Sequence, residues 1–407
     1  MIFRGGSHAL ESFLLPILTA AWVMPINRTA IRDGRVAVED GTITWVGGPS
    51  DAGAPSGAVE DLGAGVLLPG LVNAHCHLEL SHLKGRLDRS AGFAHWVEDL
   101  VGKRGADGPG AVRAAIARAI RQVEATGTVA VADVSNDLAH LDLLAASHLT
   151  AVVFHELLGW NPARAAAIAE GADARRRGPQ GDGVDIRLAA HAPHSVSPAL
   201  FDELVKRGGP AAIHLAESAE ESRFLLRGDG AWMRFLERRG LGDLPFDPPG
   251  VSPVRYLDDL GALQPGLVAA HCVYVDAADR QRLAAKGVHV AVCPRSNLNL
   301  GVGLPSVPDL LEAGVPLCLG TDSLASVDTL DLIDDAVTLH EEFPELDPAV
   351  IVEMATAGGA RALGLPGLGT LAPGMRAELA FAPAGQAPSD PAAFLVSGQA
   401  RPRRVDV

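Results

Sequence analysis

The sequence predicts an α/β protein in which a (β/α)₈ TIM-type barrel is joined to a small β-sandwich domain built from both ends of the chain. In the middle of the chain, short and nearly continuous apolar runs alternate with amphipathic segments, which is typical of a parallel sheet with helices on both faces. There are eight such runs over about 250 residues, the number and length that form a barrel. Both ends of the chain instead have a β-like composition that is rich in turns.

The two ends are expected to form one composite domain. Residues 1–68 show no helical periodicity, and 34–48 (GRVAVEDGTITWVGG) predict a strand, a turn and a second strand. The apolar stretch Phe13–Ile26 contains two prolines and is too short to span a membrane, so we interpret it as strand rather than as a secretory signal. Residues 365–407 are β-like again, which leaves 69–364 for a metal-dependent barrel.

The barrel strands are expected at the apolar runs, and helices between them. One amphipathic segment, 109–127, has a proline near its start and a glycine at its end, as helices prefer. The predicted strands are residues 71–77, 128–134, 150–156, 185–191, 211–217, 266–272, 288–294 and 315–322.

Composition limits the partners and the cellular setting. The formal net charge of −15 argues against nucleic acid as a partner, because such binding needs a cationic face. No segment reaches the roughly 18 apolar residues that predict a transmembrane helix, so no membrane partner is expected. The four cysteines show no CxxC spacing, which favours a reducing, cytoplasmic setting. The sequence does not decide whether the protein is a homo-oligomer.

Polar side chains gather at the C-terminal ends of four predicted strands, where the active sites of barrels form. His75 and His77 project to the same face of a strand, because residues two apart do so. Alone, His214 could be a core histidine and Asp322 a helix N-cap. Together, such buried groups each need a partner, and one shared cation satisfies several of them. The residues concerned are His75, His77, His214, Glu217, His271 and Asp322.

The motif LLPGLVNAHCH, together with these strand ends, resembles the amidohydrolase superfamily over nearly the whole chain. Two-metal members commonly carry a carboxylated lysine at the end of strand four, but DIRLAAHAPHS has no lysine there. One divalent metal is therefore expected, with Zn²⁺ preferred over Fe²⁺ or Mn²⁺, although nitrogen and oxygen ligands accept all three. The resemblance implies the metal ligands His75, His77, His214 and Asp322.

The resemblance also implies a reaction. Single-metal members with the HxxE arrangement mostly deaminate nitrogen heterocycles hydrolytically. Glu217 would carry a proton from water to a ring nitrogen. His271 would orient the water, and Asp322 would accept its proton. The partner is then a small purine nucleoside-like substrate.

Several segments resemble deaminases of adenine nucleosides, namely CPRSNLNLG (293–301) and APHSVSP (192–198). HCHLELSHLKG (75–85) and FHELLGW (154–160) look most like the aminodeoxyfutalosine deaminases of the alternative menaquinone route, whose substrate bears a benzoate. On this resemblance, the candidate substrate contacts are Glu79, Ser81, His82, His155, His194, Ser296 and Asn297.

Other interpretations are open at this stage. The enzyme could deaminate S-adenosylhomocysteine, adenosine or guanine, or act as a chlorohydrolase on a triazine. A non-catalytic scaffold would have lost ligands, and none is lost. Ser296 and Asn297 could simply form a turn, and His155 could support the site from behind. A substrate carboxylate would need a cation, for which Arg86 and Arg295 are the candidates.

Overall fold

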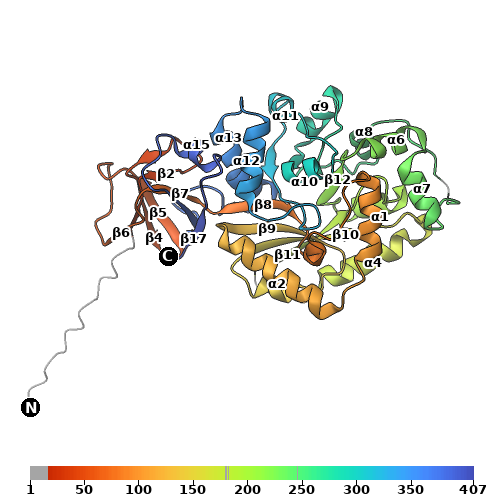
Figure 1. Ribbon diagram of the computed structural model, residues 1–407, viewed down its shortest axis with the longest axis horizontal. Coiled ribbons are helices and arrows are strands. Elements are labelled where there is room, and N and C mark those ends of the chain that lie inside the picture. Colours follow the sequence, from red (N-terminus) through yellow and green to blue (C-terminus); the bar gives the residue numbers. More distant parts are fainter. Residues whose placement is uncertain (1–16, 179–180, 182, 245) are drawn as a thin grey trace, which may run out of the picture.

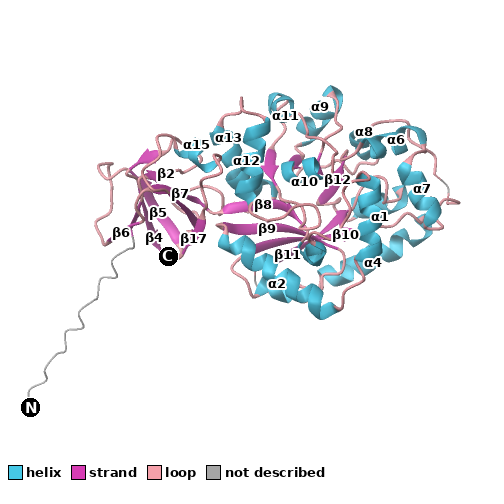
Figure 2. Ribbon diagram, viewed as in Figure 1, coloured by secondary structure: helices cyan, strands magenta, loops and turns pink. Residues whose placement is uncertain are grey.

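The computed structural model describes residues 17–178, 181, 183–244 and 246–407 and has the predicted α/β architecture. Parallel strands surrounded by helices form one part, and β-sheets made from both ends of the chain form the other (Figure 1, Figure 2). Of the stretch predicted as strand near the N-terminus, the part before residue 17 lies outside the described residues.

Each predicted barrel run contains a strand. The strands form two parallel four-stranded sheets, in the orders β11-β10-β9-β8 and β12-β13-β14-β15. Their bounds are β8 (Leu71–Cys76), β9 (Thr128–Ser135), β10 (Thr150–Leu157), β11 (Val184–Ala190), β12 (Ala212–Leu215), β13 (Val268–His271), β14 (His289–Val292) and β15 (Leu317–Leu319).

Backbone hydrogen bonds join the two sheets along both of their edges. Between β11 and β12, the N–H of Ala211 donates to the carbonyl of Leu188 (2.8 Å). Between β15 and β8, the N–H of Asp322 donates to the carbonyl of His75 (3.0 Å), and Cys76 and Asp322 form a parallel bridge. The eight strands therefore follow one another around a common interior, with their C-terminal ends on one side.

The helices cover the outer face of the strands. In α2 (Pro109–Ala125), the predicted helix, the buried residues form one stripe and pack in a cluster with Val131 and Val153 of the sheet. The other α-helices are α1 (Phe93–Lys103), α3 (Leu141–Ala145), α4 (Ala165–Arg176), α5 (Pro198–Lys206), α6 (Ala219–Arg227), α7 (Ala231–Arg238), α8 (Pro253–Asp259), α9 (Ala277–Lys286), α10 (Pro294–Asn299), α11 (Val307–Glu312), α12 (Leu332–Glu342), α13 (Pro348–Glu353), α14 (Gly359–Ala362) and α15 (Pro391–Leu395). Short helices of other types are η1 (Leu78–Leu83), η2 (Pro162–Arg164) and η3 (Met354–Gly358).

Helices α1 and α7 lie side by side at the end of the molecule that is farthest from the terminal β-sheets (Figure 1). The rings of Phe93 and Trp232 meet edge to face between them, with centroids 6.0 Å apart. Within the described ranges, no helix is both long and apolar enough to cross a membrane.

The two terminal sheets together contain strands from both ends of the chain, as the sequence predicts, and one of them combines both ends within a single sheet. Their orders are β5-β4-β1-β6 and β17-β16-β7-β2-β3, and the hairpin predicted within 34–48 is β4–β5. Leu18, Val36 and Phe381 belong to one apolar cluster that the two sheets share. The strands are β1 (Ile17–Thr19), β2 (Trp22–Val23), β3 (Ile31–Arg32), β4 (Arg35–Glu39), β5 (Thr42–Gly47), β6 (Val59–Asp61), β7 (Gly65–Pro69), β16 (Leu379–Pro383) and β17 (Arg403–Val405).

Candidate active site

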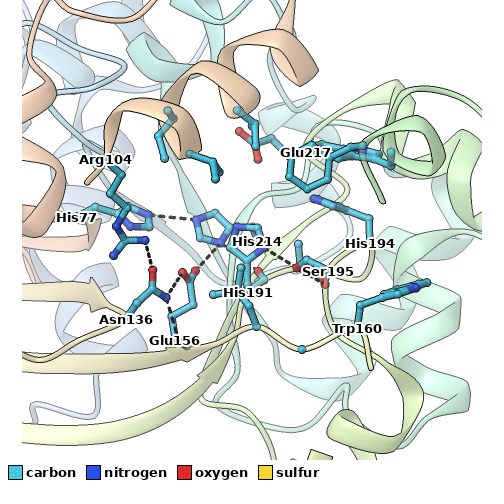
Figure 3. A pocket seen from close by; sticks show the side chains of 18 of the residues that line it. His77, Arg104, Asn136, Glu156, Trp160, His191, His194, Ser195, His214 and Glu217 are labelled. Atoms are coloured by element: carbon cyan, nitrogen blue, oxygen red, sulfur yellow. Dashed lines mark hydrogen bonds and ion pairs between the residues drawn. The ribbon is translucent and has the colours of Figure 1, made fainter. Parts of the chain in front are cut away.

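A cavity of about 530 Å³ lies at the C-terminal ends of the barrel strands. A volume in this range suits a small organic ligand. Polar side chains at the strand ends line it (Figure 3), together with aromatic and aliphatic side chains from α1, from α7 and from the loop after β10. The polar residues lining it include His77, Glu79, Glu156, His194, Glu217 and Asp322.

The four predicted metal ligands come together at the inner end of this cavity. The Nε2 atoms of His77 and His214 are 3.1 Å apart, and the Oδ1 of Asp322 lies 3.7 Å from His77 Nε2 and 4.0 Å from His75 Nε2. The ring centroids of His75 and His214 are 4.9 Å apart. All four side chains are buried. Imidazoles from the ends of the first and fifth strands thus meet at one point, and Asp322, three residues past the end of the eighth strand, supplies a carboxylate.

These residues fit a divalent metal ion. The Nε2 of His75 is buried and has no hydrogen-bond partner among the described residues. A buried nitrogen without a partner is expected where the atom binds a metal ion. Burial lowers the pKa of His77 to about 4 and that of His75 well below its ordinary value, so both rings are neutral and offer lone pairs. Three imidazole nitrogens and one carboxylate oxygen form a donor set that zinc accepts.

Asp322 is held so that one oxygen faces the histidines. Its Oδ2 accepts hydrogen bonds from the hydroxyls of Ser296 (2.5 Å) and Ser326 (3.1 Å), which leaves Oδ1 for the cluster. Its backbone has φ of 61°, a rare left-handed conformation that directs the side chain inward. No helix follows it directly, because the next one, α12, begins at Leu332, so the alternative N-cap role is wrong.

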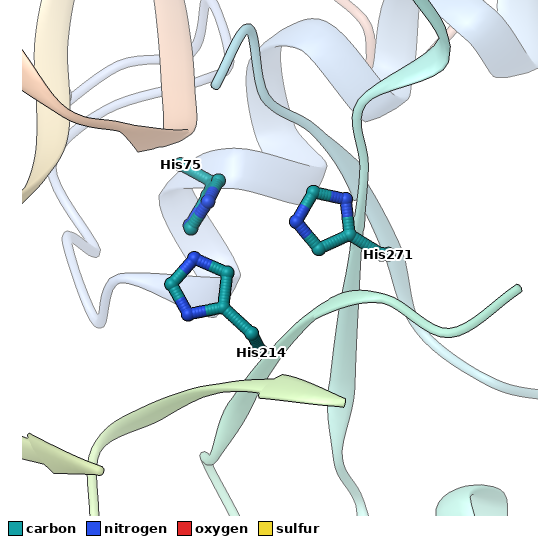
Figure 4. A group of neighbouring side chains, drawn as sticks. All are labelled: His75, His214 and His271. Atoms are coloured by element: carbon teal, nitrogen blue, oxygen red, sulfur yellow. The ribbon is translucent and has the colours of Figure 1, made fainter. Parts of the chain in front are cut away.

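His271 lies beside the same cluster and is fixed by Asn297. Its Nδ1–H donates to the amide oxygen of Asn297 (2.8 Å), which directs Nε2 toward Glu217 Oε1 at 3.6 Å. Figure 4 shows that the rings of His75, His214 and His271 gather around one region. His271 also has a left-handed backbone, with φ of 73°. In this position, the His271 ring can contact both Glu217 and a water or substrate bound at the histidine cluster.

Replacing His271 with asparagine is expected to lower turnover while the metal stays bound. The four assigned ligands remain, but the ring that lies next to Glu217 is lost. Metal content by elemental analysis and turnover by ammonia release, measured on the same sample, check this. Loss of the metal from the variant would instead make His271 a ligand and displace His214 or Asp322.

Glu217 is a buried acid with a strongly altered environment. Its side chain lies two residues past the end of β12 and lines the cavity. Burial, together with nearby Asp322 and Glu221, raises its pKa to about 8, although His214 acts to lower it. A carboxyl group that can hold a proton near neutral pH is suited to deliver and remove one.

Glu156 supports His214 from behind, a role that the sequence analysis missed. The Nδ1 of His214 lies 3.0 Å from the carbonyl of His191 and 3.3 Å from Glu156 Oε1 (Figure 3). Burial opposes a charge on His214, but the contacts with Glu156 outweigh it and raise the pKa of His214 to about 9. A carboxylate on the second nitrogen keeps Nε2 directed at the cluster, as it does for metal-bound histidines in general.

The alternation of side chains along β10 explains why Glu156 was missed. Val152 and Phe154 belong to the interior cluster, so Glu156, two residues further, also faces inward. His155 therefore faces outward, where burial and the charge of Arg175 on α4 lower its pKa. The predicted substrate contact at His155 is thus placed away from the cavity by the structure. The apolar residues at the even-numbered positions 152 and 154 indicate that position 156 also faces the barrel interior, and this pattern could have identified Glu156 from the sequence.

Replacing Glu156 with alanine is expected to weaken metal affinity by about 10- to 100-fold, the usual effect of removing such a support. The Nδ1 of His214 keeps only its hydrogen bond to the carbonyl of His191. The matched control is Glu156→Gln, which retains an oxygen acceptor and should weaken affinity less. Competition with a chromophoric chelator measures both. Equal affinities in all three proteins would contradict this role.

Of the predicted substrate contacts, Glu79 and His194 line the cavity. His194 is stacked on Trp232, with ring centroids 3.9 Å apart, and its Nδ1 lies 3.1 Å from Glu221 Oε2. Because that nitrogen is already engaged, Nε2 is the atom that His194 can offer to a ligand. The ring is thereby held in one orientation.

Glu79 belongs to a polar network beneath the cavity. Its Oε2 accepts hydrogen bonds from Ser135 Oγ (2.9 Å) and from the N–H of Asn136 (3.0 Å), while its Oε1 pairs with Arg104. Asn136 in turn donates to Glu156 Oε2 (2.8 Å). A carboxylate has room for about four hydrogen bonds, so Glu79 can still accept one from a ligand.

The other predicted contacts have different partners and do not line the cavity. The two ring nitrogens of His82 lie 3.0 and 3.1 Å from backbone carbonyl oxygens, and Ser81 is buried in η1. Ser296 and Asn297 bond to Asp322 and His271, as described above, and belong to α10 rather than to a simple turn.

The two arginines suggested for a substrate carboxylate are also engaged elsewhere. Arg86 pairs with Asp107, and Arg295 donates to Asp335 Oδ2 (2.6 Å) and to the carbonyl of Asp331 (3.1 Å). Neither lines the cavity, so these two candidates are wrong. Their spacing in the sequence gave no indication of these partners.

The fold and site agree with the family to which comparison assigns the chain. Residues 66–405 match the amidohydrolase family, and the chain belongs to it. It is therefore an enzyme of a class that hydrolyses carbon–nitrogen bonds other than peptide bonds.

Similar proteins with assigned activities narrow the class. The chain is 30% identical over 366 residues (86% of this chain, 79% of the relative) to 5-methylthioadenosine/S-adenosylhomocysteine deaminase of Pelotomaculum thermopropionicum. It is 32% identical over 348 residues (81% of each) to aminodeoxyfutalosine deaminase of Deinococcus radiodurans. An adenosine deaminase structure from Xanthomonas campestris with bound zinc has a TM-score of 0.75 at 26% identity, covering 94% of this chain and 89% of that one.

Proposed function

We propose that this enzyme is a metal-dependent hydrolytic deaminase of an adenine-type nucleoside, with 6-aminodeoxyfutalosine as its substrate. The observation that supports this most is the position of Glu217. Its carboxyl group lies at the inner end of the cavity, with Oε1 3.6 Å from His271 Nε2 and the histidine cluster beside it. The reaction replaces the 6-amino group of the purine by oxygen and consumes one water for each ammonia released.

His75, His77, His214 and Asp322 are the residues that would hold the metal. A divalent ion bound by such ligands lowers the pKa of water toward about 7, which supplies a nucleophile at neutral pH. Zinc is favoured, since the Xanthomonas campestris structure contains it.

Residues of the chain then transfer the protons and orient the attacking oxygen relative to the purine ring. Glu217 takes a proton from the attacking water and delivers it to N1 of the purine, which makes C6 more electrophilic. His271 Nε2 is directed at the attacking oxygen because Asn297 holds Nδ1. Asp322 Oδ1 accepts the second proton of the water and passes it to the amino group, so that ammonia leaves while the purine keeps the first proton on N1.

Two further residues orient the nucleoside. His194, stacked on Trp232, offers Nε2 to the edge of the base. Glu79 has one free acceptor position for a ribose hydroxyl. We also place the enzyme in the cytoplasm, because its four cysteines are free thiols, and in the menaquinone route that uses this substrate.

Ammonia release from a panel of purines tests the proposal. The panel contains aminodeoxyfutalosine, S-adenosylhomocysteine, 5′-methylthioadenosine, adenosine and guanine, each at several concentrations to give kcat/KM. We expect aminodeoxyfutalosine to have the highest value. The relative from Pelotomaculum thermopropionicum supports a second candidate, and a higher value for S-adenosylhomocysteine or 5′-methylthioadenosine would assign the enzyme to that activity.

A further inference from the structure

The outer part of the cavity is built for an apolar, flat group. Aromatic side chains from α1, from the loop after β10 and from α7 line it. Phe93 is stacked on Trp96, with centroids 6.1 Å apart, and meets Trp232 edge to face. Trp232 in turn contacts Phe235 at 5.8 Å between centroids. The apolar residues used in this argument are Phe93, Trp96, Trp160, Trp232, Phe235 and Leu236.

Two arginines also line the cavity, and they differ in their partners. Arg104 is engaged, because it donates to both Glu79 and Asn136. Arg164 directly precedes α4, is exposed, and has no ion pair or side-chain hydrogen bond within the part of the chain that the structure describes. The cavity therefore has at its edge a charged guanidinium that none of the described residues neutralises.

We propose that Arg164 binds a negatively charged group at the far end of the substrate, so that the cavity selects an adenine nucleoside whose distal substituent is an aromatic carboxylate. A guanidinium pairs with a carboxylate through two parallel hydrogen bonds, which lysine cannot reproduce. The protein carries a net charge of −15, so it offers no long-range attraction to an anion and needs such a local cation.

The aromatic walls decide which carboxylate fits. The amino-acid end of S-adenosylhomocysteine also carries a carboxylate, but next to an ammonium group. An ammonium next to the carboxylate would be repelled by the like charge of the Arg164 guanidinium, whereas an aromatic ring gains from contact with Trp160 and Phe235. The inference rests on the proposed function, because it takes the purine to lie at the histidine cluster.

The test compares substrates that differ only at the distal end. The zinc-loaded enzyme and its Arg164→Gln variant are assayed with aminodeoxyfutalosine, with its methyl ester and with 5′-methylthioadenosine. We expect the variant to lose at least about 10-fold in kcat/KM for the acid, the scale of a hydrogen bond to a charged group. The ester and 5′-methylthioadenosine should be affected much less. Arg164→Lys should recover part of the loss.

Two controls separate the role of Arg164 from a general change of charge. Arg175→Gln removes the same charge from the other end of α4, away from the cavity, and should leave the acid's kcat/KM unchanged. Added salt should raise KM for the acid in the parent enzyme and much less in Arg164→Gln, because the exposed ion pair is screened.

The pattern of results distinguishes the two proposals. Equal losses for acid and ester, or no loss for the acid, would overturn the role of Arg164 while the deaminase function stands. A parent enzyme that prefers S-adenosylhomocysteine would overturn the aromatic carboxylate. An enzyme that deaminates none of these nucleosides would contradict the proposed function, and the role of Arg164 would fall with it.

Discussion

Replacing Glu217 with glutamine is expected to lower turnover by about 10²- to 10⁴-fold or more, the usual contribution of a general acid–base group. Glutamine has nearly the same shape and can occupy the same position beside His271, but it cannot exchange a proton. The metal ligands are untouched, so metal content and folding should stay at the parent level. Single-turnover ammonia release separates the loss in the chemical step from any change in binding.

The matched control for this variant is Glu220→Gln. Glu220 lies in the first turn of α6, three residues further along the chain, and does not line the cavity. The Glu220→Gln substitution removes the same charge close to Glu217 but outside the cavity, so turnover should be unchanged. Near-normal turnover of a metal-replete Glu217→Gln enzyme would exclude Glu217 from proton transfer.

The sequence was sufficient to predict the barrel and the convergence of its strand ends. Parallel strands that are covered on both faces must be apolar throughout, so their runs are visible without an alignment. Their C-terminal ends meet on one side of a barrel, so polar residues there belong to one site even when they are far apart in the chain. This convergence places His75 Nε2 and Asp322 Oδ1 4.0 Å apart, although the two residues lie at opposite ends of the barrel segment of the chain.

Side-chain direction was harder to predict at the strand ends. Simple alternation fails in β8, where the register with β9 shifts between Asn73 and Cys76. His271 and Asp322 have positive φ, which no propensity of their residue types predicts. These local departures from regular strand geometry determine which residues face the cluster.

Supporting contacts were the least predictable part. Ser296, Asn297 and His82 are polar residues in motifs near the site, and their types alone do not distinguish a contact with substrate from a contact with a neighbouring side chain. In the structure, Ser296 forms a hydrogen bond with Asp322, and Asn297 forms one with His271. Arg104 and Glu79 form a hydrogen bond although they are 25 residues apart in the chain. This contact depends on how α1 packs at the end of the barrel, which the sequence does not indicate.

Removing the metal from the enzyme with a chelator is expected to abolish turnover and to lower the temperature of unfolding. An ion that binds only the folded chain stabilises it by about 4 kcal/mol at a free concentration 1,000 times its Kd. Without it, the buried Nε2 of His75 has no partner, and His77 and His214 face each other with their Nε2 atoms 3.1 Å apart. Differential scanning calorimetry of the two forms, with re-addition of zinc as the control, measures this effect.

One equivalent of zinc per chain should restore both activity and stability. A second group of candidate ligands, formed by Glu156, His191 and His214, shares the cluster's third histidine. However, the Nδ1 of His214 already lies 3.0 Å from the carbonyl of His191, to which it donates, and is not free to bind another ion. Strand four also offers no lysine to bridge two metals. If full activity required two equivalents, this single-metal assignment would be wrong, and Glu156 would have to be regarded as a ligand rather than as the support of His214.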